Sequence, residues 1–311
     1  MELLHYARRV PDAGPLVIAV GKFDGFHLGH RKIVAALCAR AADSGMVPSV
    51  FTFRTFPVDF TLTPWEERVR LLAEAGVRVC IWSDFADIAQ WEPRRFVGYL
   101  AGRNVRHVVV GAGFVFGAGR AGDVRFLRRE ASRFGMGVSV VRCVTRGGGR
   151  VSSSRIRACL RRGEIESATA MLGRHFSVEG TVVAGAGRGR RLGFPTANLR
   201  LSHPLFLPDG VYAGWASVSG RAFRGAAVFI GASPTFADPS RKFEVFIDGA
   251  RERFFGRTMR VLLVSRIREA RRFSSGARLR EQIQRDVDLI RGILRRSPPL
   301  TAAFDGSGPK G

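Results

Sequence analysis

The chain has 311 residues, of which 46% are hydrophobic, and its formal net charge at pH 7 is +24. A chain of this length usually forms two domains, and the apolar content is ample for a core in each. It contains no run of about 18 apolar residues and its first residues are charged, so we expect neither a membrane span nor a signal peptide.

The positive charge comes almost entirely from arginine and would suit a polyanionic partner such as nucleic acid. However, the arginines are spread over both halves, without a zinc-finger pattern or an aromatic RNA-binding signature. Nucleic acid is therefore not the expected principal partner, and the sequence predicts no particular oligomeric state. The cysteines lie singly within apolar segments, which indicates buried thiols and a cytoplasmic protein; they are Cys38, Cys80, Cys143 and Cys159.

The first half alternates short apolar runs with helical patterns. Runs typical of strands buried on both faces cover 16–20, 47–53, 77–82, 107–111 and 138–144. Helical patterns lie at 31–43, 64–75, 93–102 and 122–134. Thr63, Pro64 and Glu66 form the start signal of the second helix as a capping box, and Gly76 can end it. The alternation predicts an α/β, doubly wound, Rossmann-like parallel sheet.

The stretch "GKFDGFHLGHRKIV" (21–34) follows the first predicted strand and leads into the first predicted helix. Ligands of such sheets bind outside the carboxyl ends of the strands, and a helix N-terminus attracts anions. His27 and His30 could there donate to phosphate oxygens; metal binding and ordinary capping are the alternatives. Zinc is the poorer alternative because no further ligands are placed nearby. The stretch therefore predicts a nucleotide site.

From about residue 177 onward, consecutive strand-like runs are separated by glycine and aspartate turns. An amphipathic helix over 277–294, opened by Ser274 or Ser275, closes the region. These features predict a small antiparallel β-barrel with a terminal helix. We expect a first domain over 1–172, a second over 173–296, and a disordered tail over 297–311.

The segment "GAGRGRRLGFPTANL" (185–199) stands out within the predicted barrel. Its glycines permit tight turns near an anion, and Thr196 and Asn198 offer oxygen atoms suited to hard cations or phosphates. A barrel turn would explain the glycines but not this polar pair.

Taken together, these motifs resemble those of bacterial bifunctional riboflavin kinase/FAD synthetases. The string Gly21, Phe23, Asp24, Gly25, His27, Gly29, His30 resembles the signature of their adenylyltransferase half, and "VSSSRIR" (151–157) resembles a later motif. The segment 185–199 resembles their kinase motif, and "LPDGVY", "IGASPTF" and "FEVFI" resemble later kinase landmarks. The resemblance covers roughly residues 14 to 295. It implies a transferase that phosphorylates riboflavin to FMN and adenylylates FMN to FAD, with ATP and Mg²⁺.

The resemblance also implies roles for particular residues. In the adenylyltransferase half, His27 and His30 would contact the ATP phosphates. The remaining predicted nucleotide-site residues there are Gly21, Phe23, Asp24, Gly25, Ser152, Ser153 and Arg157. In the kinase half, Glu244 would be the general base, and Thr196 and Asn198 would hold Mg²⁺. The remaining nucleotide-site residues there are Gly185, Gly189, Arg190, Gly193 and Pro195.

The adenylyltransferase half departs from the family pattern at three positions. Ala112 and Gly113 stand where polar side chains are usual, and Phe56 stands where histidine is common. We therefore expect adenylylation to be weaker than phosphorylation. One alternative is a riboflavin kinase with a weakened or repurposed N-terminal module. Another is a basic regulator that binds flavin or nucleic acid, against which the intact "PTAN" and Glu244 argue.

Overall fold

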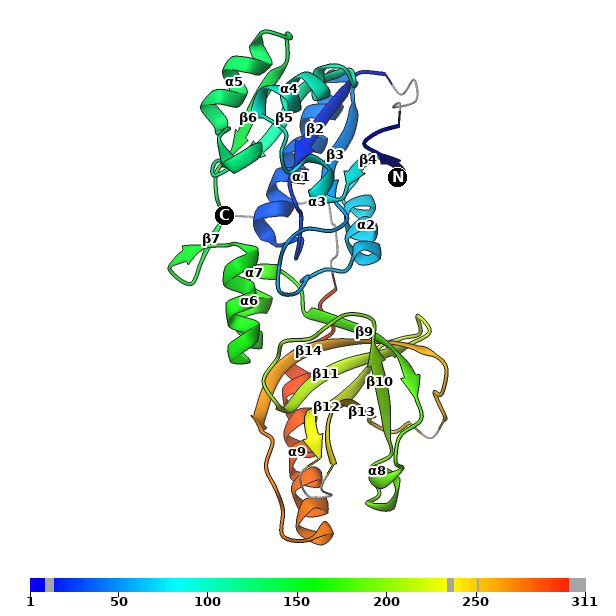
Figure 1. Ribbon diagram of the computed structural model, residues 1–311. Coiled ribbons are helices and arrows are strands. Elements are labelled where there is room, and N and C mark those ends of the chain that lie inside the picture. The colour runs from blue at the N-terminus through cyan, green and yellow to red at the C-terminus, as the bar shows by residue number, and fades with distance from the viewer. Residues whose placement is uncertain (9–13, 234–237, 251, 302–311) are drawn as a thin grey trace. The chain divides into compact units, whose positions relative to one another are not determined.

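The structure, a computed structural model, describes residues 1–8, 14–233, 238–250 and 252–301 (Figure 1). Two compact units divide at Ser153 and Ser154. Two short helices, α6 (Ser153–Arg162) and α7 (Ile165–Leu172), follow this point, and α7 packs on strands of the second unit. The predicted boundary at residue 172 thus follows α7, and it stays a prediction about separable domains.

The first unit is built on a parallel sheet of six strands in the order β1-β4-β3-β2-β5-β6. All five predicted strands are present, and β2 is buried along its whole length, as its apolar sequence requires. An unpredicted edge strand, β1, pairs with β4. The strands are β1 (Glu2–His5), β2 (Leu16–Val20), β3 (Val47–Phe53), β4 (Val79–Ser83), β5 (Val105–Gly111) and β6 (Gly137–Val141).

Helices connect the strands of this sheet. Four of them lie where the sequence predicts helices, and the short helix Phe85–Ile88 was not predicted. They are α1 (Leu28–Ser44), α2 (Trp65–Glu74), α3 (Phe85–Ile88), α4 (Pro93–Ala101) and α5 (Val124–Ser132), with a 3-10 turn, η1 (Ala118–Arg120), and a hairpin of β7 (Thr145–Arg146) and β8 (Gly149–Arg150). The predicted capping box of α2 is wrong. The N-cap is Pro64, which makes no side-chain capping bond. The Thr63 hydroxyl, which was expected to cap the helix, instead accepts the Gly25 N–H at 2.8 Å. Gly76 adopts φ +93°, as predicted for the helix end.

The second unit contains a closed antiparallel barrel with the strand order β10-β13-β12-β11-β14-β9. The predicted fold class is therefore confirmed for both units. Ser275, not Ser274, caps the terminal helix by accepting the Arg278 N–H. The elements are β9 (Phe176–Val183), α8 (Arg188–Arg191), β10 (Thr196–Leu201), β11 (Gly210–Val218), β12 (Arg224–Ser233), β13 (Asp238–Ile247), β14 (Thr258–Glu269) and α9 (Gly276–Arg296).

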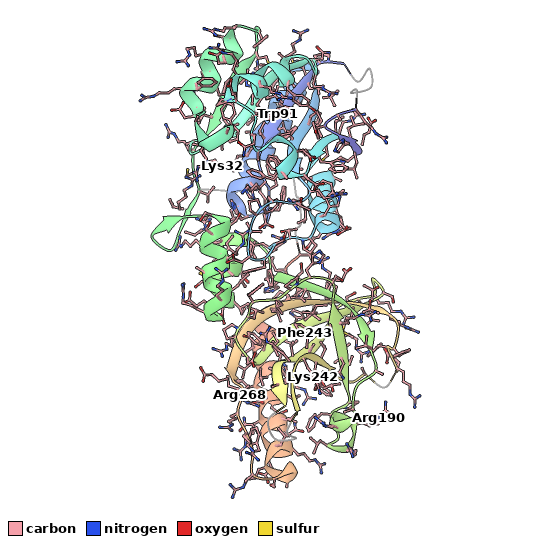
Figure 2. The ribbon with its side chains drawn as sticks, viewed as in Figure 1. Lys32, Trp91, Arg190, Lys242, Phe243 and Arg268 are labelled. Carbon is pink, nitrogen blue, oxygen red and sulfur yellow. The ribbon has the colours of Figure 1, made fainter. Side chains whose placement is uncertain are left out.

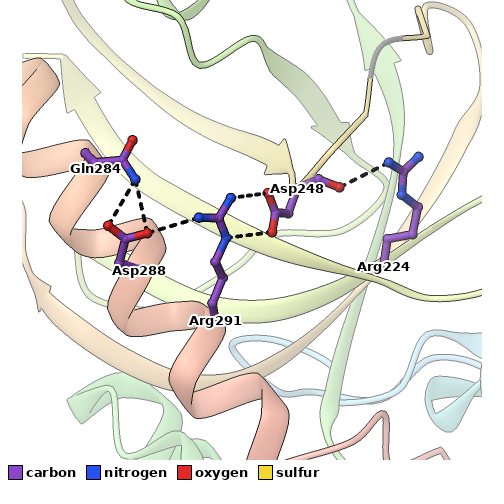
Figure 3. Close-up of polar contacts among 5 residues, drawn as sticks. All are labelled: Arg224, Asp248, Gln284, Asp288 and Arg291. Atoms are coloured by element: carbon purple, nitrogen blue, oxygen red, sulfur yellow. Dashed lines mark hydrogen bonds and ion pairs between the residues drawn. The ribbon is translucent and has the colours of Figure 1, made fainter.

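Helix α9 covers the outer face of strands β11, β12 and β14. Its apolar stripe packs on side chains of these strands; the buried members are Val211, Ala213, Val264, Ile290 and Leu294. Ion pairs fasten its polar flank (Figure 3). The Arg291 guanidinium donates to both carboxylate oxygens of Asp248 at 2.8 Å and to Asp288 at 3.0 Å. Arg224 in turn donates to the Asp248 carbonyl.

The chain beyond α9 returns to the barrel. The Trp215 indole N–H donates to the Ser297 carbonyl at 2.8 Å, and the backbone N–H of His175 donates to the Leu300 carbonyl at 3.0 Å. The Nε2 atom of His175 lies 3.2 Å from the Pro298 carbonyl oxygen. The first residues of the predicted disordered tail are thus hydrogen-bonded, and 302–311 lie outside the described residues.

The four cysteines differ in how far they are buried. Cys80 and Cys159 are buried and Cys38 is partly buried, but Cys143 is exposed, so the prediction of four buried thiols is wrong there. Cys143 lies in the connection between β6 and the β7–β8 hairpin, outside both elements. No helix in the described part of the chain is long and apolar enough to cross a membrane.

The Asp248–Arg291 pair makes the stability of the barrel pH-dependent. The hydrogen bonds from Arg291 lower the pKa of Asp248 below its ordinary 3.8. The folded state therefore favours the ionised carboxylate, so the stabilisation is present above pH 3.8 and is lost as the pH falls through the lowered pKa. Because the pair is partly exposed, we expect Asp248→Asn to cost up to about 1 kcal/mol of unfolding free energy at pH 7.

Denaturant unfolding of the variant and the wild type at several pH values measures this difference. It should shrink toward zero in strongly acidic solution. Asp288→Asn is the matched control, because it removes a more exposed partner of Arg291 and should cost less. An equal deficit of the Asp248 variant at every pH would contradict the assignment.

Candidate functional site

The loop between β2 and α1 has an unusual backbone. Phe23 (φ 50°), Gly25 (φ 85°) and Phe26 (φ 37°) all lie in the left-handed region, which non-glycine residues seldom adopt. The side chains of Phe23 and Phe26 are each 1% exposed, so burial of two large rings holds this strained backbone. Such strain persists where surrounding contacts over-determine it, and it is frequent at ligand sites.

Asp24 is buried within this loop, at 1% exposure, and its carboxylate is used by the fold. It accepts the backbone N–H groups of Leu62 at 3.2 Å and Thr63 at 3.0 Å. The Thr63 hydroxyl accepts the Gly25 N–H in return. These bonds tie the loop after β2 to the segment before α2, at the carboxyl edge of the sheet. Asp24 therefore shapes the loop in which the histidines lie.

His27 is the N-cap of α1, and its Nδ1 atom accepts the His30 N–H at 3.3 Å. A neutral imidazole whose Nδ1 accepts a hydrogen bond carries its proton on Nε2, so Nε2 is a donor. The two rings stack with centroids 3.7 Å apart. A Cβ on Gly29 would lie 3.0 Å from Cε1 of His27, which explains the glycine between the histidines. The structure thus brings both imidazoles to one helix N-terminus.

Ser153 is brought to the same loop from a distant part of the sequence. Its hydroxyl donates to the Asp24 carbonyl at 2.7 Å. Ser152, which precedes it, is half-buried at the start of α6. Arg157, the other residue of this motif, is buried on α6 and belongs to the second compact unit.

Sequence reasoning missed Arg68, which is 1% exposed on α2. Its guanidinium donates to the carbonyls of Lys22 at 2.9 Å, Phe53 at 2.8 Å and Arg54 at 3.3 Å, and so joins the loops after β2 and β3. Burial lowers its pKa, and the neighbouring Asp24 opposes that shift. Phe56, the residue in place of the family's histidine, contacts two cations through its ring: Arg68 of α2 lies 5.1 Å and Lys22 5.2 Å from the ring centroid.

Arg150 is a second residue that sequence reasoning missed. A Cβ built on Gly113, just beyond β5, would lie 3.0 Å from the Arg150 guanidinium carbon. The guanidinium therefore occupies the place of a side chain at position 113 and brings several N–H donors to the carboxyl edge of the sheet. Its position two residues before Ser152 was the signal available in the sequence.

The predicted kinase residues Thr196, Asn198 and Glu244 meet on two paired strands. Asn198 of β10 is the cross-strand partner of Glu244 of β13. The Thr196 hydroxyl lies 3.5 Å from a Glu244 carboxylate oxygen, at the limit of a hydrogen bond. On β13 the neighbours Phe243 and Val245 are buried within the barrel, so Glu244 faces outward (Phe243 is labelled in Figure 2).

The glycines of the kinase-like segment permit close approaches. A Cβ on Gly185 would collide with the Asn198 amide, and one on Gly189 would lie 3.0 Å from the Thr196 hydroxyl oxygen. Gly193 adopts φ +87°. It precedes Phe194, whose N–H bonds back to the Gly189 carbonyl at 2.8 Å and closes the turn before Pro195. Arg190 lies on the short helix α8 within this turn (Figure 2).

A cavity of about 160 Å³ lies between α9 and the strands that carry Thr196 and Glu244. Glu244 and Thr196 line one part of it, and apolar side chains of the barrel and α9 line much of the rest. A largely apolar slot with a few converging polar groups is typical of a site for a small organic molecule. Within the described residues, no group of three or more His, Cys, Asp or Glu side chains could hold a metal ion. The hydroxyl of Thr196 and the amide of Asn198 are the oxygen donors at hand.

The chain matches two family models over most of its length. Residues 10–155 match the FAD synthetase model, and residues 172–294 match the riboflavin kinase model. A bifunctional riboflavin kinase/FMN adenylyltransferase of Bacillus subtilis is 32% identical, with 87% of this chain and 90% of the relative covered. One of Escherichia coli is also 32% identical, with 95% and 98% covered.

A solved structure has the same fold along nearly the whole chain. It is described as a macrolide-efflux protein from Streptococcus pneumoniae, has a TM-score of 0.84 and is 27% identical. The alignment covers 94% of this chain and 99% of that one. The fold described above, a parallel sheet followed by a barrel, therefore also occurs in an experimental structure.

Proposed function

The chain belongs to the family of bifunctional riboflavin kinases/FMN adenylyltransferases, and we propose that it converts riboflavin to FMN and FMN to FAD, using ATP in both steps. The observation that carries this proposal is that the residues of the two motifs lie together in two separate groups. One is the histidine pair at the N-terminus of α1. The other is the group of Thr196, Asn198 and Glu244 beside a cavity. Thiols without disulfides are consistent with a cytoplasmic location.

For adenylylation we propose that His27 and His30 bind the ATP phosphates. The N-terminus of α1 supplies N–H groups and a positive dipole end, and the Nε2 proton of His27 adds a donor. These donors would stabilise the charge that builds up on the α-phosphate while an FMN phosphate oxygen attacks it and pyrophosphate leaves. Arg150 would replace some of the hydrogen-bonding groups that the side chains of Ala112 and Gly113 lack, but not all of them. We therefore still expect adenylylation to be the slower step and FMN to accumulate before FAD.

For phosphorylation we propose that Glu244 accepts the proton of the ribityl 5′-hydroxyl while that oxygen attacks the γ-phosphate. Thr196 and Asn198 fit Mg²⁺, which prefers a few oxygen ligands and keeps the rest of its shell for water and phosphates. When bound, Mg²⁺ would neutralise charge on the phosphates. The apolar cavity beneath α9 would hold the isoalloxazine ring and exclude water from it.

We propose that each activity belongs to one domain, 1–172 for adenylylation and 173–296 for phosphorylation. A fragment starting at Gly173 should then phosphorylate riboflavin alone. One starting at Ser154 should also do so and be more stable, because α7 packs on β9 and β14. Thermal unfolding and FMN formation of both fragments measure this. If neither fragment is active while the full chain is, the barrel depends on the first domain.

Glu244→Gln should reduce FMN formation by about 10²–10⁴-fold, the usual contribution of a general base. The amide is nearly isosteric, so the fold should persist. Thr196→Ala and Asn198→Ala should instead raise the Mg²⁺ concentration needed for half-maximal rate. Chromatographic analysis of FMN made from riboflavin and ATP measures both effects. Glu179→Gln, an exposed change on β9, is the matched control and should keep the wild-type rate. A Glu244 variant within a few-fold of wild type would exclude Glu244 as the base.

His27→Ala removes both an imidazole and a helix cap, so His27→Asn separates the two roles. Asparagine is a good N-cap and should keep α1 stable. Both variants should lose FAD formation by about 10²–10³-fold, the usual loss for one transition-state donor, and keep FMN formation. FAD synthesis from FMN and ATP, with thermal unfolding, distinguishes the outcomes. If His27→Asn makes FAD at the wild-type rate, the histidine serves only as a cap.

A further inference from the structure

A second cavity lies next to the one that contains Glu244. Its volume is about 340 Å³, against about 160 Å³ for the first. Three residues line both cavities: Ala227, Phe246 and Val287. They form a shared wall, so the second cavity begins where the first one ends. The activity proposed above assigns no use to this second space.

The wall and the space behind it follow from the strand pattern. Ala227 of β12 and Phe246 of β13 are cross-strand partners, and Val287 comes from α9. Glu244 and Phe246 of β13, and Asp248 directly after it, lie on one face, about 7 Å apart from one to the next. Behind the wall, β12 contributes Gly225 and Ala226 to the lining, and the other lining residues include Trp215, Asp248, Arg291 and Arg295. A Cβ on Gly225 would lie 3.2 Å from Leu294, so this glycine lets α9 pack close to β12 at the edge of the second cavity.

Another part of the first cavity lining is polar. Arg268 donates to one carboxylate oxygen of Asp286 from Nε at 2.9 Å and from Nη2 at 2.7 Å. Gln282 donates to the other oxygen at 2.8 Å. Asp286 is only 5% exposed, so this carboxylate is a fixed polar group. Arg268 and Asp286 line the cavity on β14 and α9, whereas the wall residues Ala227 and Phe246 lie on β12 and β13.

An isoalloxazine ring has one polar edge, with carbonyl and N–H groups, and one apolar dimethylbenzene edge. The polar edge matches Arg268 and Asp286, and the apolar edge matches the wall. We propose that Phe246 and Val287 set the size limit for substituents on the dimethylbenzene edge, and that the cavity behind them can accept larger ones. This inference rests on the proposed riboflavin kinase activity of the barrel.

The test uses the full chain and a riboflavin analogue in which a propylamino group replaces the 8-methyl group. Val287→Ala and Phe246→Leu each replace a wall side chain by a smaller one. Each should raise kcat/KM for the analogue relative to riboflavin by about tenfold or more, the discrimination typical of a pocket for one extra methylene. The gain should appear in KM, because the wall does not touch the reacting hydroxyl at Glu244.

Val264→Ala is the matched control. Val264 is a buried valine that packs under α9 but lines neither cavity, so its loss loosens the interface without opening the wall. It should leave the substrate ratio unchanged. An unchanged ratio in both wall variants, or an equal rise in the control, would overturn the inference.

Failure of the proposed function can be told apart from failure of this inference. If the wild type does not phosphorylate riboflavin, the proposed kinase activity is wrong. In that case, calorimetry measures the affinities of the analogue and of riboflavin for the same variants, and their ratio tests whether the wall limits substituent size. Tighter relative binding of the analogue in both wall variants supports it, and unchanged relative binding overturns it.

Discussion

The carboxylate of Asp24 controls the geometry of the first site. Two backbone N–H groups, those of Leu62 and Thr63, meet at this one buried group. Leaving such donors unpaired would cost about 1–3 kcal/mol each, so the two loops at the carboxyl edge of the sheet are held in one arrangement. Arg68 joins the same loops by donating to three backbone carbonyls. The strained backbone that leads to His27 persists because these contacts leave it no alternative.

The second site depends on the two-residue period of β13. The strand buries Phe243, Val245 and Ile247 in the barrel and presents Glu244 and Phe246 to the cavity that α9 also lines. One strand thereby contributes to the core, carries the proposed base, and forms part of a cavity wall. A one-residue slip in register would exchange these faces and destroy all three functions together. The ion pairs between Asp248 and Arg291 help to hold α9 over this face.

The sequence predicted the sheet and the barrel because their strands are short, apolar and bounded by turn residues. It missed β1, whose four residues carry no clear period, and it placed Thr63 in a cap that the structure replaces with a bond to Gly25. Motifs identified the histidines, Ser153 and Glu244. Arg68 and Arg150 could not be identified in this way, because their positions depend on contacts between segments distant in sequence. The same holds for the second cavity, which results from small residues on a strand meeting a helix about 60 positions later.

The segment after α9 bears on how this protein should be handled. The half-buried indole N–H of Trp215 and the backbone N–H of His175 both find their acceptors in 297–300. Burial lowers the pKa of His175, and its Nε2 atom lies 3.2 Å from the Pro298 carbonyl oxygen in the same segment. A chain trimmed at the last turn of α9 would leave these donors without their acceptors. A purification tag is better joined beyond residue 301, where it leaves the hydrogen bonds to residues 297–300 intact.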